Sequence, residues 1–290
     1  MSFGPLSIAL IDPARLVSAD DATAVAAVVT KQLQNHLAPA WNVTGSVHYF
    51  SDPHSVPNGY ALLQLVESAG DDSDYGFHTL AGNRPVAYVQ VEEGSNLWSL
   101  TVSHEALEMT VDPTGSTLIA GSSPDGQRHV QYLAEICDPC QSPDVGYSID
   151  GYLVSEFVLK NYYGPASTPG PYSVNGRITA PRSLLPDGYL SWMDPTQANQ
   201  WFKKAMDSDG VPSTSRIGSP PTGMALRSWV DRATMRSRLA PKLPQDLLER
   251  LDRHRKRVLE AGRASVEESI VFWKKRSARK STARRPKKSS

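Results

Sequence analysis

Cysteines are scarce in this chain, and long apolar runs are missing. Two cysteines among 290 residues do not make a disulfide framework, which excludes the disulfide-stapled class of small secreted domains. No stretch approaches the ~18 consecutive apolar residues of a membrane span. The first residues, Met1–Pro5, lack a basic region followed by an apolar one. We therefore expect no signal peptide, no membrane span, and a cytoplasmic or virion-associated protein.

Basic residues are also scarce, but only in the first two thirds of the chain. Residues 1–200 contain 7 Lys and Arg against 21 Asp and Glu, whereas residues 201–290 contain 23 against 9. This asymmetry indicates an acidic domain followed by a basic arm. Such an arm would bind nucleic acid or another anionic surface without sequence specificity. The alternative is that it lies on the acidic domain or keeps the chain soluble.

The pattern of apolar residues predicts an α+β fold. The first third of the chain is expected to form, in order, a strand, a helix, three strands and a second helix. These elements are expected at Leu6–Ile11, Ala22–Leu37, Asn42–Phe50, Tyr60–Val66, Val86–Val91 and Leu97–Val111. Further strands are expected at Thr117–Ala120 and His129–Ile136, a hairpin at Tyr147–Val154, and a short helix within Trp192–Met206.

Composition divides the chain into four expected parts. One domain covers residues 1–210, and a Pro-, Gly- and Ser-rich linker covers residues 211–223. A helical extension with apolar residues at helical spacing covers residues 224–273. The last part, residues 274–290, is basic and almost free of apolar residues, so we expect it to be disordered.

The helix expected over Leu97–Val111 carries the chemistry. It contains no Lys or Arg, and apart from His104, Glu105 and Glu108 its residues are almost all apolar or small hydroxyl residues. A helix of this composition should be largely buried. Burying a carboxylate without compensation costs several kcal/mol or forces protonation. A bound cation is the simplest compensation for two carboxylates and an imidazole in one place.

The spacing of these three residues supports a metal site. His104 and Glu108 are four residues apart and share one helix face, and Glu105 lies about 100° round the helix from His104. The HExxH zinc proteases use this geometry, because two helix residues hold the metal and the adjacent Glu polarises its water. The motif in this chain is an HExxE variant, with Glu108 in place of the second His.

The element order, with the motif on the second helix, resembles the amino-terminal half of the zincin metallopeptidase fold. The run from His78 through His104 and Glu105 to Glu135 and Asp138 is also similar to a little-characterised group of bacterial and phage proteins of this kind. The resemblance covers roughly residues 1–195. It implies a peptidase-like hydrolase in which Glu105 is the general base. A peptide or protein substrate would lie along an edge strand, Val86–Val91.

A third metal ligand must come from downstream of the helix. Gluzincins use a Glu on a second helix, followed by an Asp that orients the first His, and Glu135 and Asp138 match that pair. We rank Glu135 first as the ligand, Asp112 second and Asp138 third. Asp112 is eight residues after His104, but Asp-Pro at a helix end is also ordinary turn chemistry.

One divalent ion is expected, and zinc is the first choice. Manganese and calcium are alternatives, because one nitrogen and two carboxylate ligands suit harder cations better than two nitrogens would. His78 and Tyr147 are candidates for lining the cleft, although a lone loop His is more often a bystander. The CxPC pattern at Cys137–Cys140 indicates a local tie or two plain thiols rather than a redox pair.

A non-catalytic interpretation competes with the hydrolase. The charged helix residues would then form a buried hydrogen-bond cluster without metal, or a structural or degenerate zincin site. The protein would be a structural or nucleic-acid-associated component, for example of a virion. Glu108 in place of a second His favours this interpretation, as does the basic tail, because extra negative charge weakens the acidification of metal-bound water.

Overall fold

The computed structural model describes residues 4–69, 75–81, 84–92, 95, 97–221 and 226–234, with side chains described as far as Val230. All of these belong to the first of two compact units, Met1–Leu243; the second, Pro244–Ser290, lies outside the described residues. The described part is α+β and contains two five-stranded sheets and a separate hairpin. None of its helices is long and apolar enough to cross a membrane.

The first sheet is mixed and has the strand order β2-β1-β3-β5-β4. Only β4 runs antiparallel to its neighbour. The strands are β1 (Leu6–Ile11), β2 (Gly45–Phe50), β3 (Ala61–Val66), β4 (Gly76–Ala81) and β5 (Arg84–Gln90). The helix α1 (Ala19–Gln32) begins at Ser18, whose hydroxyl accepts a hydrogen bond from the Asp21 N–H. A π-turn at Leu33–Leu37 and α2 (Ala38–Trp41) continue it.

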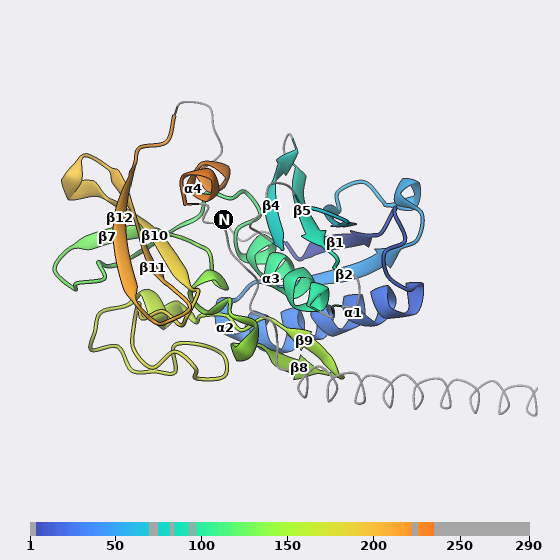
Figure 1. Ribbon diagram of the computed structural model, residues 1–290, viewed down its shortest axis with the longest axis horizontal. Coiled ribbons are helices and arrows are strands. Elements are labelled where there is room, and N and C mark those ends of the chain that lie inside the picture. Colours follow the sequence, from blue (N-terminus) through green and yellow to red (C-terminus); the bar gives the residue numbers. More distant parts are fainter. Residues whose placement is uncertain are drawn as a thin grey trace, which may run out of the picture. The chain divides into compact units, whose positions relative to one another are not determined.

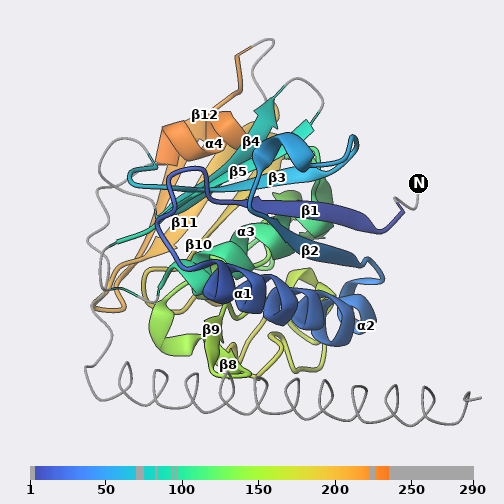
Figure 2. The same ribbon diagram turned by 90° about the vertical axis from the view of Figure 1, so that its right-hand side faces the viewer.

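The helix α3 (Trp98–Val111) is the centre of the described unit. It packs with α1 on one face of the first sheet (Figure 2), and every residue from Trp98 to Thr110 is buried. The Ser103 hydroxyl donates to Gln32 of α1 at 2.7 Å and accepts from the Ser155 N–H at 2.9 Å. The predicted burial of this helix is therefore confirmed, and polar contacts fix its rotation.

The second sheet is antiparallel, with the strand order β12-β11-β10-β7-β6. Its strands are β6 (Leu118–Ser122), β7 (His129–Leu133), β10 (Tyr189–Asp194), β11 (Gln200–Met206) and β12 (Pro212–Gly218). The hairpin β8 (Tyr147–Ile149) and β9 (Tyr152–Val154) packs against α3. The helix α4 (Leu226–Thr234) lies between β12 and β4 (Figure 1), and its Trp229 packs edge-on against Trp201 at 6.1 Å between ring centroids.

Several expectations about the strands need correction. The segment expected as an edge strand, Val86–Val91, corresponds to β5, which is interior because β4 pairs with its other side. Sequence patterns missed β4 because a Gly- and Asp-rich sequence precedes it and the strand begins with glycine. The strand expected over His129–Ile136 ends at Leu133, so Glu135 lies in the irregular segment that follows β7.

The C-terminal part of the described unit differs more from what the sequence predicts. The segment expected to hold a short helix, Trp192–Met206, contains half of β10 and all of β11, joined by a 3-10 turn at Pro195–Gln197. The strand β12 occupies most of the expected linker. The sequence predicted a linker because an exposed, polar edge strand has the composition of a loop. The predicted helix after it begins at Leu226, but it packs onto the second sheet. Residues 235–273 and 274–290 lie outside the described residues.

Candidate metal centre

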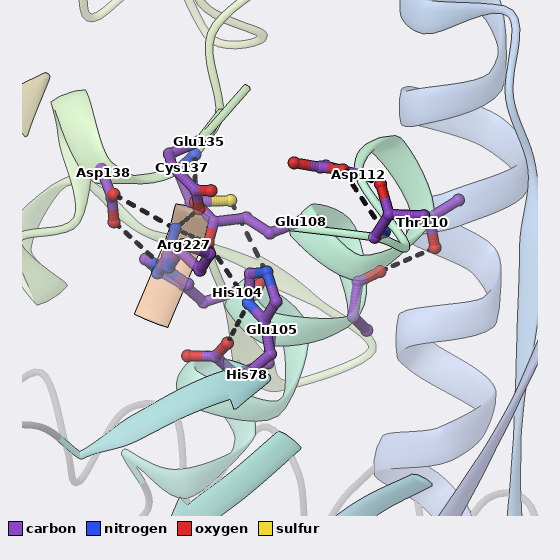
Figure 3. Close-up of polar contacts among 12 residues, drawn as sticks. His78, His104, Glu105, Glu108, Thr110, Asp112, Glu135, Cys137, Asp138 and Arg227 are labelled. Carbon is purple, nitrogen blue, oxygen red and sulfur yellow. Dashed lines mark hydrogen bonds and ion pairs between the residues drawn. The ribbon is translucent and has the colours of Figure 1, made fainter. Parts of the chain in front are cut away.

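Seven ionisable side chains from four segments converge at one end of α3 (Figure 3). His104, Glu105 and Glu108 come from α3 itself, and His78 comes from β4. The segment after β7 supplies Glu135 and Asp138, and α4 supplies Arg227. His104 is 9% exposed, and the other six side chains belong to residues that are no more than 6% exposed.

Glu108 is the hub of this cluster. Its Oε1 accepts a hydrogen bond from the Cys137 N–H at 3.1 Å, which leaves Oε2 directed at the other charged groups. That oxygen lies 3.4 Å from His104 Nε2 and 3.4 Å from Arg227 Nη1. It is also 3.8 Å from His78 Nδ1. The segment after β7 thus orients the carboxylate that α3 places at the centre.

His104, Glu108 and Asp138 form a group with the spacing of metal ligands. His104 Nε2 lies 3.4 Å from both Glu108 Oε2 and Asp138 Oδ1, and the three ligand atoms lie within 4.8 Å of one another. Distances of this size exceed the 2.7–3.2 Å of ordinary N–H···O hydrogen bonds. They match the ~3.3–3.4 Å that separates two ligands bound tetrahedrally at about 2.0–2.1 Å. The group could therefore hold a metal ion.

Glu105 lies beside this group and is held from the first sheet. Its Oε2 is 2.9 Å from His78 Nδ1, and both side chains are buried. A Cβ on Gly76 would lie 3.2 Å from Glu105 Oε1 and 2.6 Å from Thr101 Cγ2, so glycine lets β4 approach the helix here. The sequence placed His78 in a loop, but it lies on the missed strand β4, which carries it into the cluster.

Glu135 is paired with Arg227 rather than with His104. Arg227 Nη1 forms an ion pair with Glu135 Oε2 and lies 3.7 Å from Asp138 Oδ2. Nothing in the sequence singled out Arg227, since it follows the expected linker and belongs to the expected helical extension, residues 224–273, which contains many other basic residues. The Tyr189 hydroxyl, which also escaped prediction, hydrogen-bonds Asp138 from β10.

Several buried atoms of the cluster have no hydrogen-bond partner among the described residues. They are His78 Nε2, Glu108 Oε2, Glu135 Oε1 and Oε2, and Asp138 Oδ2. Buried polar atoms nearly always have a hydrogen-bond partner. A buried carboxylate oxygen accepts from a hydrogen-bond donor or binds a cation. The ion contacts with His104 and Arg227 offset only part of this charge. The arrangement therefore has donor atoms and negative charge with which it could hold a metal ion.

The electrostatics of the cluster follow from burial and proximity. Burial alone would raise the pKa of Glu108, but His104, Arg227 and His78 together lower it to about 2. Burial alone would lower the pKa of His104, but Glu108, Asp138 and Glu105 raise it well above its usual value. Burial and the Glu108 carboxylate raise the pKa of Asp138 to about 6, against the opposing effects of His104 and Tyr189. Without a metal, a proton on His104 supplies part of the missing positive charge.

Two residues proposed from the sequence lie elsewhere. Asp112 is fully buried, and its carboxylate accepts hydrogen bonds from the backbone N–H and hydroxyl groups of Thr114 and Thr117, at 2.8–3.3 Å. It therefore caps the turn after α3 and does not join the cluster. The Tyr147 hydroxyl contacts Gln32 and His36, at 3.0 and 2.7 Å, so Tyr147 does not line the centre.

The two cysteines behave as plain buried thiols. Both are free, and burial raises the pKa of each thiol well above its usual value. A raised pKa disfavours the reactive thiolate. Cys137 contributes through its backbone, by the hydrogen bond to Glu108, and its Sγ contacts the His104 carbonyl oxygen at 3.8 Å.

Comparisons of the chain with protein-family models, with curated proteins and with solved structures find no match.

Replacing Asp112 separates its capping role from metal binding. We expect Asp112→Ala to lower the free energy of unfolding by about 1–3 kcal/mol, because the part-buried N–H and hydroxyl donors of Thr114 and Thr117 lose a charged acceptor. Metal uptake by the folded variant should equal that of the wild type. Urea denaturation and metal analysis measure the two effects. Loss of metal from Asp112→Ala that is still fully folded would contradict the capping role.

Proposed function

We propose that the protein is a zincin-like, metal-dependent hydrolase that cleaves peptide bonds. His104, Glu108 and Asp138 would hold one divalent ion. The observation that carries the proposal is the buried group of three ligand atoms, with His104 Nε2 3.4 Å from each carboxylate, beside a fourth acid, Glu105. Bound there, the ion would acidify a water molecule and polarise the substrate carbonyl.

Asp138 replaces Glu135 as the preferred third ligand. The resemblance to gluzincins ranked Glu135 first, but its carboxylate is paired with Arg227. Asp138 Oδ1 lies 3.4 Å from His104 Nε2, and the Tyr189 hydroxyl supports the Asp138 carboxylate. Zinc remains the first choice for the ion, because His104 Nε2 lies 3.4 Å from each carboxylate, about the separation of two ligands in a tetrahedral zinc site. Manganese and calcium stay as alternatives, since two of the three ligands are carboxylates.

Glu105 is the proposed general base. It neighbours His104 on the helix, and the His78 imidazole at 2.9 Å fixes the orientation of its carboxylate. A carboxylate positioned in this way would take a proton from the attacking water molecule and give it to the leaving amine. His78 would act as a positioning residue, since it reaches the reaction only through Glu105.

The antiparallel edge strand β4 is the proposed guide for substrate. It takes the place that the sequence assigned to Val86–Val91, because β4 forms the edge and carries His78. A small pocket beside the cluster is lined by His78 and Leu80 of β4, by Thr114 and Gly115, and by Arg227 of α4, among others. An extended peptide bound along β4 would bring its backbone past Glu105.

A non-catalytic role is the second candidate, and one observation favours it. Arg227 and a protonated His104 already supply positive charge to the buried acids. A cluster balanced in this way could stabilise the fold without an ion. The basic tail, which would bind nucleic acid or another anionic surface in this case, lies outside the described residues.

Metal analysis distinguishes the two candidates. Protein purified without chelator should carry one equivalent of metal, and His104→Ala and Asp138→Asn should lose it. His129→Ala, which removes an exposed histidine on β7, is the matched control and should retain the ion. A well-folded wild type that takes up no zinc, manganese or calcium would refute the metal centre.

The general base is tested by activity. Glu105→Gln should retain the metal, because the amide only replaces a group beside the ligands, while cleavage of a peptide library falls by about 10²–10⁴-fold. Glu67→Gln, at an exposed position, is the control and should cleave normally. Mass spectrometry of the digested library measures peptide cleavage by both variants. Unchanged cleavage by metal-loaded Glu105→Gln would rule out this mechanism.

A further inference from the structure

The cluster contains a second set of ligand atoms next to the first. His78, Glu108 and Glu135 each offer one atom, and these atoms lie within 4.8 Å of one another. Glu108 belongs to both sets. His78 Nε2 and both Glu135 carboxylate oxygens are buried and accept or donate no hydrogen bond among the described residues. Two adjacent sets that share one carboxylate have the arrangement of a two-ion centre, in which ions lie about 3.5–4 Å apart.

Arg227 lies where the carboxylates of the second set meet. Its Nη1 forms an ion pair with Glu135 and lies 3.4 Å from Glu108 Oε2. The side chain is buried, and its backbone N–H donates to the Gly115 carbonyl at 3.0 Å. Trp229, two residues on, packs against Trp201 of β11. The helix α4 thus holds the guanidinium in the cluster, because the Arg227 backbone binds Gly115 and Trp229 packs on the second sheet.

The charge of the cluster is consistent with one divalent ion beside this guanidinium. Glu105, Glu108, Glu135 and Asp138 carry four carboxylates, all buried. One divalent ion and one guanidinium would offset three of these charges, leaving one on the general base. Without the guanidinium, Glu135 would be a buried carboxylate with no cation, which is strongly unfavourable unless another cation replaces it.

We propose that Arg227 is a built-in cation that holds the second ion position, formed by His78, Glu108 and Glu135, so that the centre takes one divalent ion and not two. This inference rests on the proposed metal centre at His104, Glu108 and Asp138. By binding Glu135, Arg227 keeps that carboxylate away from the ion and leaves a coordination position for water. The segment that carries α4 therefore sets the number of ions in the site.

The test is the stoichiometry of zinc binding by the full-length protein. The wild type should bind one equivalent of zinc, and Arg227→Met should bind two. Arg227→Lys keeps a cation at this position and should bind one. The double variant Arg227→Met/Glu135→Gln lacks a ligand of the second position and should also bind one. Manganese loading gives a second readout, because two ions bridged by Glu108 produce an exchange-coupled electron paramagnetic resonance spectrum.

The outcomes separate this inference from the proposed function. One equivalent in both the wild type and a folded Arg227→Met overturns the role of Arg227 and leaves the metal centre intact. Two equivalents in the wild type overturn it as well. No zinc in the folded wild type overturns the metal centre and this inference together. If Arg227→Met does not fold, Arg227→Gln carries the same expectation of two equivalents, since it also removes the charge.

Discussion

The burial of four carboxylates around one end of α3 is the constraint on which the rest of the centre depends. Glu105, Glu108, Glu135 and Asp138 lie in a region almost closed to solvent, where an uncompensated charge is costly. The fold brings nitrogen-bearing side chains to them from three directions. His104 comes from the helix itself, His78 from β4 and Arg227 from α4. The proposed metal would supply the positive charge that Arg227 leaves unmatched.

The surrounding structure serves to hold this cluster in one geometry. Ser103 and Gln32 join α3 to α1, and the Cys137 N–H fixes Glu108 from the segment after β7. Asp112 closes the turn that leads from α3 to the second sheet. Because the sheets contribute His78 and Tyr189 from their strands, both halves of the described unit take part in one site. A side chain placed by packed elements loses little further freedom when a ligand binds.

Much of the first sheet and the centre of the cluster was predictable from local patterns. The strand at Leu6–Ile11 agrees residue for residue, and the burial of α3 followed from its lack of Lys and Arg. The approach of His104 to Glu108 followed from helix periodicity. These features depend on neighbours within a few residues in the chain, which is the range over which sequence patterns are informative.

The remaining features depend on contacts between distant segments. The position of β4 depends on its pairing with β5, and His78 enters the cluster only because β4 forms the edge. The choice between Glu135 and Asp138 depends on Arg227, which lies 92 and 89 positions further along the chain. The strand β12 has an exposed, polar sequence that resembles a linker. No local pattern records such pairings.

The central claim is that a metal ion, and not protons and Arg227 alone, balances the buried acids. The most direct test is a crystal structure of the zinc-loaded protein with anomalous scattering recorded at the zinc absorption edge. The account predicts one anomalous peak within bonding distance of His104 Nε2, Glu108 and Asp138, with Arg227 still paired to Glu135. A well-ordered cluster with no peak, or a peak bound by other residues, would contradict it.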